Sequence, residues 1–144
     1  MLYGKKLEIL DESTTKDANK SKSFAIVFFC HCLKWYYQNY KQGTSWIESI
    51  ITSSRSMKNI LYRNYPDNKN SATFAKTANL LHDAYLKGIE AAIKDTGILD
   101  ISKDTDIWKS FCTLEIICNE SKVRSWMISN AYSSEVIDKI NNKK

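Results

Sequence analysis

A ten-residue apolar run from Phe24 to Leu33 (FAIVFFCHCL) constrains the fold of this chain more than any other feature of its sequence. The run is about half as long as a membrane-spanning helix must be, so it indicates a buried core element. A helix over residues 23–40 would be apolar on every side in its first half. Because such a helix has to be surrounded by other helices, the run predicts the centre of a helical bundle.

Residues that break helices are scarce, with 4 glycines and 1 proline among 144 residues. A β-sandwich or a loop-rich scaffold needs such residues at its tight connections, so long helices are favoured. Apolar residues recur at helical spacing in further segments, which start near residues 45, 71, 105, 121 and 133. The sequence therefore predicts one all-α domain, a compact bundle of about five to six helices with the apolar helix at its centre.

The first 22 residues are polar and charged, and few apolar side chains are present to anchor them. We expect at most a short strand or turn at Leu7 to Leu10. Ser21 or Ser23 is the expected N-cap of the first helix, because a serine side chain can accept hydrogen bonds from the free amides of an opening turn. The expected organisation is a loosely docked polar segment at 1–22, a helical domain at 23–141 and a basic tail at 142–144.

Cysteine usage and the flanks of the apolar run both favour a cytoplasmic protein. The 4 cysteines are too few for a disulfide-stapled scaffold, and three of them fall inside apolar helical patterns, as free cysteines commonly do. No compact basic segment precedes the apolar run and no small-residue cleavage pattern follows it. We therefore expect reduced thiols, a cytoplasmic location and no contact with a membrane.

Metal and cofactor chemistry finds no support in the sequence. Cys30, His31 and Cys32 carry side chains that bind zinc, but successive helical residues diverge by about 100°, so the two thiols point roughly 200° apart. The glycines are isolated from one another and none adjoins a serine, so neither a phosphate-binding loop nor a nucleophile elbow is predicted. We expect no catalytic residue, no metal and no cofactor.

The two histidines offer the one catalytic alternative. His31 and His82 could in principle act as an acid–base pair, but they lie on different predicted helices. Small helical ribonucleases place an arginine before such a histidine, with four to six residues between the two. It is absent upstream of His82, where Ala75, Lys76 and Thr77 stand. Both histidines are expected to be ordinary helix residues.

An aromatic group follows the apolar run and consists of Trp35, Tyr36, Tyr37 and Tyr40. These residues cover successive faces of the predicted helix, so they cannot all point into one core. Exposed tyrosine and tryptophan are enriched at protein interfaces. The group is therefore a candidate set of partner-binding anchors.

A second candidate is the window from Ser49 to Pro66, which contains no acidic residue. It holds the basic residues Arg55, Lys58 and Arg63 and the tyrosines Tyr62 and Tyr65. Such a set could face an acidic protein surface, or could follow a phosphate backbone while its rings stack on bases.

Together these features predict a small protein-binding module that acts by surface complementarity. One form would be an immunity, antitoxin or inhibitor protein that blocks a toxin or an enzyme by direct binding. A basic nucleic-acid-binding regulatory domain that uses the window is the alternative. Either a monomer or a homodimer is compatible with exposed aromatic residues.

Overall fold

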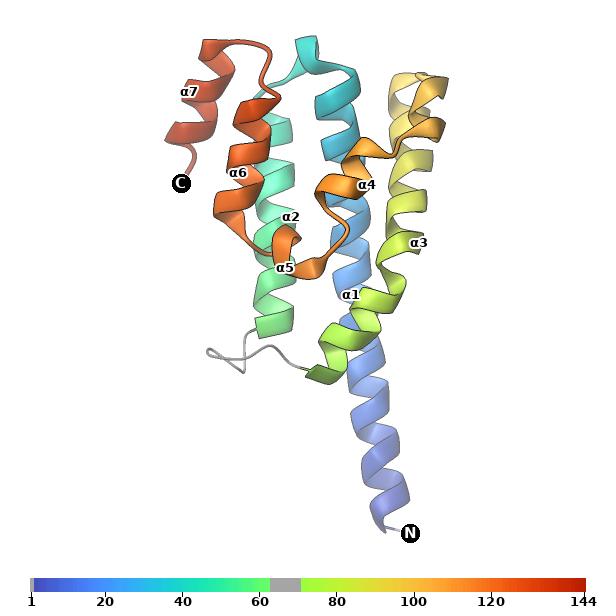
Figure 1. Cartoon of the computed structure of the whole chain (residues 1–144). Coiled ribbons are helices and arrows are strands. Elements are labelled where there is room, and N and C mark those ends of the chain that lie inside the picture. The colour runs from blue at the N-terminus through green and yellow to red at the C-terminus, as the bar shows by residue number, and fades with distance from the viewer. Residues whose placement is uncertain (1, 63–70) are drawn as a thin grey trace.

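The structure is a computed structural model that describes the backbone of residues 2–62 and 71–144 and the side chains of residues 13–62 and 72–144. These described parts form α-helices and two 3-10 helices and no strand, which confirms the predicted all-α bundle (Figure 1). The elements are α1 (Leu2–Tyr37), η1 (Asn39–Lys41), α2 (Thr44–Tyr62), α3 (Ser71–Thr96), η2 (Leu99–Lys103), α4 (Asp106–Ser110), α5 (Leu114–Ile117), α6 (Glu120–Ser129) and α7 (Ser134–Asn142).

Helices α1, α2 and α3 form the body of the bundle, and the shorter helices α4 to α7 cover one side of it (Figure 1). Helix α2 returns antiparallel to α1, and α3 then runs parallel to α1. Ion pairs from Lys22 to Asp83 and from Lys34 to Asp95 join α1 to α3 along this contact. The C-terminal ends of α1 and α3 therefore lie at the same end of the bundle.

The core is built around the apolar run, as the sequence predicts. Phe28, Phe29 and Leu33 of α1 are fully buried, and the ring of Phe28 meets the ring of Phe111 edge-on at 4.9 Å. One side of the run nevertheless reaches solvent, because Val27 is 40% exposed. The central helix is thus enclosed by its neighbours on all but one side.

The expected start of the first helix is wrong, because α1 begins at Leu2 and continues without interruption through Ser21 and Ser23. Leu7 to Leu10 are helical as well, and the boundary expected after residue 22 falls inside the helix. No proline interrupts this stretch, and Ala18 and Ser21 are 1% and 0% exposed. Burial of that face favours continuing the helix over capping it at a serine. The first turns of α1 project beyond the bundle (Figure 1).

Local sequence signals account for two other helix ends. Gly97 ends α3 with a φ of 73°, the left-handed conformation that glycine adopts at little cost. Ser133 caps α7, since its hydroxyl accepts a hydrogen bond from the Val136 amide at 3.3 Å. Helix α6 starts earlier than expected because Asn119 caps it in place of Ser121.

Within the described ranges, none of the helices combines the length and the apolarity that a membrane span requires.

Candidate binding surfaces

Trp35, the first member of the aromatic group, is a core residue and not a partner-binding anchor. Its side chain has no exposed surface, and Nε1 donates a hydrogen bond to the main-chain oxygen of Met127 at 3.2 Å. The ring fills the space between α1 and α6. A side chain with no exposed area cannot contact a partner, so the expectation for this residue is corrected.

Tyr36 and Tyr37 lie at the C-terminal end of α1 and bond to the segment that leads into α4. The Tyr37 hydroxyl donates to Asp104 Oδ1 at 2.8 Å, and the Tyr36 hydroxyl donates to Asp106 Oδ2 at 3.2 Å. Tyr37 is half-buried, whereas Tyr36 is 37% exposed. Their rings meet edge-on at 5.2 Å. Tyr36 is therefore accessible but fixed in direction, and Tyr37 mainly ties α1 to the next layer.

Asp104 is the centre of this hydrogen-bonded group and is only 7% exposed. Its carboxylate accepts from the Tyr85 hydroxyl at 2.6 Å and from the Ile107 amide at 3.2 Å, in addition to Tyr37. The Ile107 bond satisfies one of the free amides in the first turn of α4. The two tyrosine partners come from α1 and α3, so no local sequence signal could have indicated them.

Tyr40 is 61% exposed on η1, and Lys41 Nζ lies 6.0 Å from the centre of its ring. Large hydrophobic side chains exposed among the described residues are Val27, Tyr36, Tyr40, Leu86, Leu99 and Tyr132. Four of these six stand in the last turn of α1, in η1, at the start of η2 and between α6 and α7. These segments lie at the end of the bundle where α1 and α3 terminate (Figure 1). We call this surface, defined by Tyr36, Tyr40, Leu99 and Tyr132, the tyrosine end.

Gln42 holds two parts of the tyrosine end together. Its Nε2 donates to the main-chain oxygens of Trp35 at 3.0 Å and Asn130 at 2.8 Å. Its Oε1 accepts from the Tyr132 amide at 2.8 Å. The turn that carries Tyr40 is thereby fixed against the turn that carries Tyr132. These partners lie 7, 88 and 90 positions from Gln42, so no local sequence signal indicates this role.

The basic window on α2 is less positive in the fold than in the sequence. Both Arg55 Nε and Arg55 Nη2 donate to the Glu120 carboxylate, so the charge of Arg55 is paired. Lys58 is exposed, and Tyr62 is half-buried. The predicted residues Arg63 and Tyr65 lie outside the described residues.

A polar groove runs between α2 and the α5–α6 segment and is made of two adjoining cavities of about 270 and 440 Å³. Both cavities are lined by Lys58, Cys118 and Glu120, and the larger one also by Glu115. Hydrogen bonds from Arg55, opposed in part by burial, hold the pKa of Glu120 below its usual value. Burial raises the pKa of the Cys118 thiol to about 12, so this thiol is a poor nucleophile. The groove is lined by both acidic and basic groups.

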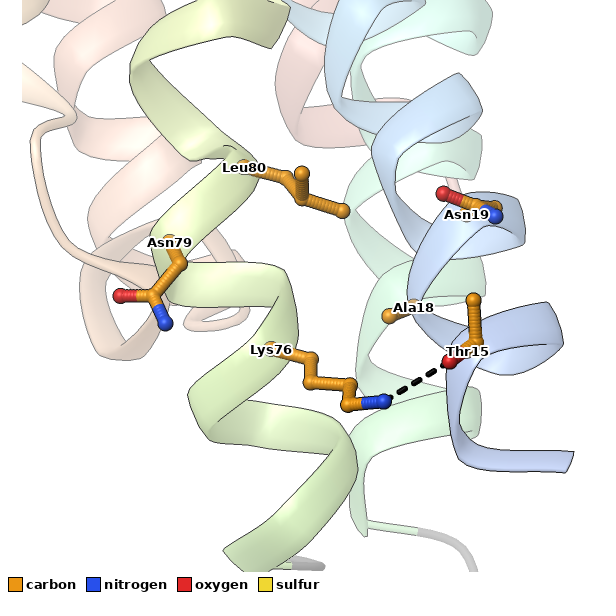
Figure 2. Close-up of a pocket in the computed structure, with 6 residues that line it drawn as sticks. All are labelled: Thr15, Ala18, Asn19, Lys76, Asn79 and Leu80. Atoms are coloured by element: carbon orange, nitrogen blue, oxygen red, sulfur yellow. Dashed lines mark hydrogen bonds between the residues drawn. The ribbon is translucent and has the colours of Figure 1, made fainter. Parts of the chain in front are cut away.

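A third cavity, of about 270 Å³, lies between α1 and α3 near the start of α3 (Figure 2). Lys76 crosses from α3 to donate a hydrogen bond to Thr15 Oγ1 at 2.8 Å, and Leu80 lies above it, while Asn79 points away from α1 (Figure 2). No predicted site residue lines this cavity. Lys76 closes it as a bridge between the two helices.

The histidines are not brought together. His31 Nδ1 bonds to the main-chain oxygen of Val27 at 2.9 Å, and burial lowers the pKa of its ring, opposed in part by that bond and, to a smaller extent, by the charge of Asp95. His82 lies on α3, where its ring meets the ring of Trp108 edge-on at 5.0 Å. Asp95, the residue of α3 that influences His31, stands thirteen residues further along the same helix. That spacing corresponds to about 20 Å along a helix.

The four cysteines are free thiols. In the described part of the chain, no three or more His, Cys, Asp or Glu side chains are grouped so that they could hold a metal ion.

Comparison with known proteins identifies one family. The model of the family described as Domain of unknown function DUF29 matches residues 7–115. This range covers most of α1, all of α2, α3 and α4, and the start of α5. No curated protein and no solved structure matches the chain.

Proposed function

We propose that this chain, which belongs to the DUF29 family, is a protein-binding module that engages a partner protein through the tyrosine end. The observation that carries the proposal is the gathering there of four of the six exposed large hydrophobic side chains found in the described residues. A tyrosine ring buries a large apolar area while its hydroxyl stays hydrogen-bonded, which suits the centre of an interface.

The way these side chains are held also supports a binding role. Asp106 orients the Tyr36 hydroxyl, and Gln42 fixes the Tyr132 main chain beside the turn of Tyr40. A surface ordered before binding loses less conformational entropy when a partner docks, so more of the contact energy contributes to affinity.

The partner that fits this surface is a folded protein with apolar pockets that accept the rings of Tyr40 and Tyr132. An immunity, antitoxin or inhibitor protein that covers the working surface of a cytoplasmic toxin or enzyme is the specific form that we propose. Electrostatic steering by the basic window contributes little in this form, because Glu120 pairs with Arg55. The same pairing, together with Glu115 in the groove, reduces support for nucleic-acid binding through α2.

Site-specific photo-crosslinking in native lysate tests the proposal. A benzophenone amino acid replaces Tyr40, Tyr132 or, as the matched control, Leu86, which is 44% exposed on α3 away from the tyrosine end. We expect one protein adduct from positions 40 and 132 that position 86 does not give. Equal adducts from all three positions, or adducts that nuclease treatment abolishes, would contradict the proposal.

The captured protein then allows affinities to be measured. Tyr40→Ala and Tyr132→Ala should each weaken binding by about 30-fold or more, as truncation of an interface hot spot does. Leu86→Ala should leave the affinity within about twofold. Circular dichroism should show unchanged helix content in all three variants, which separates loss of contact from loss of fold.

A further inference from the structure

Helix α7 is attached to the bundle by few apolar contacts. Of its nine residues, only Val136 and Ile140 are buried, at 7% and 0% exposed. A helix this short is not stable alone in water and depends on its tertiary contacts. Polar contacts must therefore contribute much of what holds α7 in place.

Most of those contacts come from a clasp made of Arg55, Glu120 and Arg124, and one more is the partly exposed ion pair of Lys143 with Glu48 of α2 at 3.2 Å. The Glu120 carboxylate accepts hydrogen bonds from both guanidinium groups. Arg124 donates onward to the main-chain oxygens of Ile140 at 2.5 Å and Lys143 at 2.6 Å. Arg55 donates to the main-chain oxygen of Lys144 at 2.6 Å. Arg124 thus binds main-chain oxygens of the last turn and the C-cap of α7, where the helix dipole is negative, and Arg55 binds the chain just beyond the cap.

Glu120 is the residue on which this clasp depends. It lies between the two guanidinium groups, orients both of them and offsets their mutual repulsion. The side chains of Arg55 and Glu120 are 42% and 30% exposed, so dissolved salt can screen their attraction.

We infer that α7 is a strap that docks only while Glu120 holds Arg55 and Arg124 together, and that its docking sets the position of Tyr132. Tyr132 stands in the turn between α6 and α7, immediately before the Ser133 cap. When α7 leaves the bundle, the turn that carries Tyr132 keeps its hydrogen bond to Gln42 but is no longer held by the docked helix. The link to Tyr132 rests on the proposed function, whereas the docking of α7 does not.

Hydrogen–deuterium exchange of the full chain, read by mass spectrometry, tests the strap directly. In Glu120→Gln, amides of residues 134–142 should exchange about tenfold faster, since the loss of charge-assisted hydrogen bonds raises the population of the open helix. Amides of α1, α2 and α3 should keep their wild-type rates.

The matched control is Glu135→Gln, which makes the same change of charge within α7 itself. Among the described residues, Glu135 forms one exposed pair, with Lys139 at 3.7 Å, so its loss should change exchange by less than about threefold. Equal effects of the two substitutions would overturn the role of Glu120.

A measurement on the unmodified chain covers the case in which Glu120→Gln unfolds as a whole. Raising sodium chloride from about 0.05 M to about 0.5 M shortens the screening length to roughly 4 Å. Exchange of residues 134–142 should then accelerate several-fold more than exchange of α1. A salt response that is the same in α7 and α1 would overturn the strap.

The two proposals fail in different ways. If α7 loosens as described but the crosslinker at position 132 captures no partner even in the wild type, the strap stands and the proposed function falls. If both hold, Glu120→Gln should reduce adduct formation at position 132 more than at position 40. Unchanged adducts at position 132 with a loosened α7 would overturn the coupling to Tyr132.

Discussion

Lys34 of α1 and Asp95 of α3 form an ion pair at 2.6 Å across the longest helix contact of the bundle. They stand 61 positions apart in the sequence, and so do Lys22 and Asp83 and also Thr15 and Lys76. A constant separation means that α1 and α3 run parallel and in register along most of α3. The same register places Gly88 of α3 opposite residues 26–30 of α1.

Gly88 allows this close approach, and Gly88→Ala should destabilise the fold. A Cβ at position 88 would lie 2.7 Å from Phe29 Cβ and 3.2 Å from the Cys30 amide nitrogen. Overpacking of this kind costs about 1–3 kcal/mol, which exceeds the helix propensity gained from alanine, about 1 kcal/mol at most. Urea denaturation should show a lower free energy of unfolding.

The control for this substitution is Gly43→Ala. At position 43 the nearest atom to an added Cβ is the Lys41 main-chain oxygen at 4.0 Å. The added methyl group therefore meets no clash. Alanine also restricts the unfolded chain more than glycine does, so the free energy of unfolding should stay unchanged or rise by up to about 1 kcal/mol. A Gly88→Ala protein as stable as Gly43→Ala would show that α1 and α3 can separate without cost.

Ser21→Ala should stabilise the protein. The Ser21 hydroxyl is fully buried, and its Oγ has no hydrogen-bond partner among the described residues. Burying an unpaired hydroxyl costs about 1–3 kcal/mol, and alanine removes that cost with little change of volume. We expect thermal denaturation to show a melting temperature a few degrees above the wild type.

Ser53→Ala is the comparison for the Ser21 substitution. Ser53 is 2% exposed, but its hydroxyl donates to the Ser49 main-chain oxygen at 2.7 Å. Because this hydroxyl is already hydrogen-bonded, removing it should not give the rise in melting temperature that is expected at position 21. Equal shifts of the melting temperature in both variants would contradict the argument from the unpaired hydroxyl.

The fold class follows from local sequence signals, because helical periodicity and scarce glycine and proline act within a few residues. These signals did not predict the start of α1 correctly. Ser21 and Ser23 are good caps, yet burial of Ala18 and Ser21 against the bundle decides in favour of a longer helix. Tertiary packing of this kind overrides local propensity.

For the candidate binding surfaces too, local sequence signals do not predict the tertiary contacts. Tyr36 and Tyr40 of the aromatic group are exposed, as expected for part of the group. The sequence did not indicate which way each neighbouring side chain points, and Trp35 faces the core. Tyr132 joins them through Gln42, 90 positions earlier. Arg55 loses its free charge to Glu120, 65 positions later. Contacts between residues so far apart in the sequence depend on how the chain folds in three dimensions, and local patterns in a single sequence do not reveal them.

The free energy of unfolding should fall as pH rises above 10. Burial, and then the hydrogen bond to Asp104, raise the pKa of Tyr85 well above its ordinary value of 10.0. The unfolded chain loses this proton near pH 10 while the folded chain keeps it, so stability present below pH 10 is lost as pH rises. The slope reaches about 1.4 kcal/mol per pH unit for one such group.

Tyr85→Phe should reduce that slope, as measured by urea denaturation between pH 9 and 11. The comparison uses slopes, because loss of the bond to Asp104 lowers stability at every pH. An unchanged slope in Tyr85→Phe would show that the Tyr85 hydroxyl is not protected in the folded protein.

One thiol of four should react rapidly in the native protein. Cys112 is exposed, whereas Cys30, Cys32 and Cys118 are 5%, 0% and 5% exposed. Burial raises the pKa of all three buried thiols, to about 12 for Cys118. At pH 8 a thiol of that pKa is ionised in about one molecule in ten thousand, and the thiolate is the reactive form. Cys118 should therefore react slowly although it lines the groove.

Titration with a chromogenic disulfide at pH 8 measures this directly. We expect one equivalent in the fast phase for the native chain and four equivalents in denaturant. Cys112→Ser should abolish the fast phase, while Cys30→Ser should retain it, because Cys30 is reached only when α1 and α3 separate. A second fast equivalent that persists in Cys30→Ser and disappears in Cys118→Ser would mean that the groove opens to reagents, contrary to the burial of Cys118.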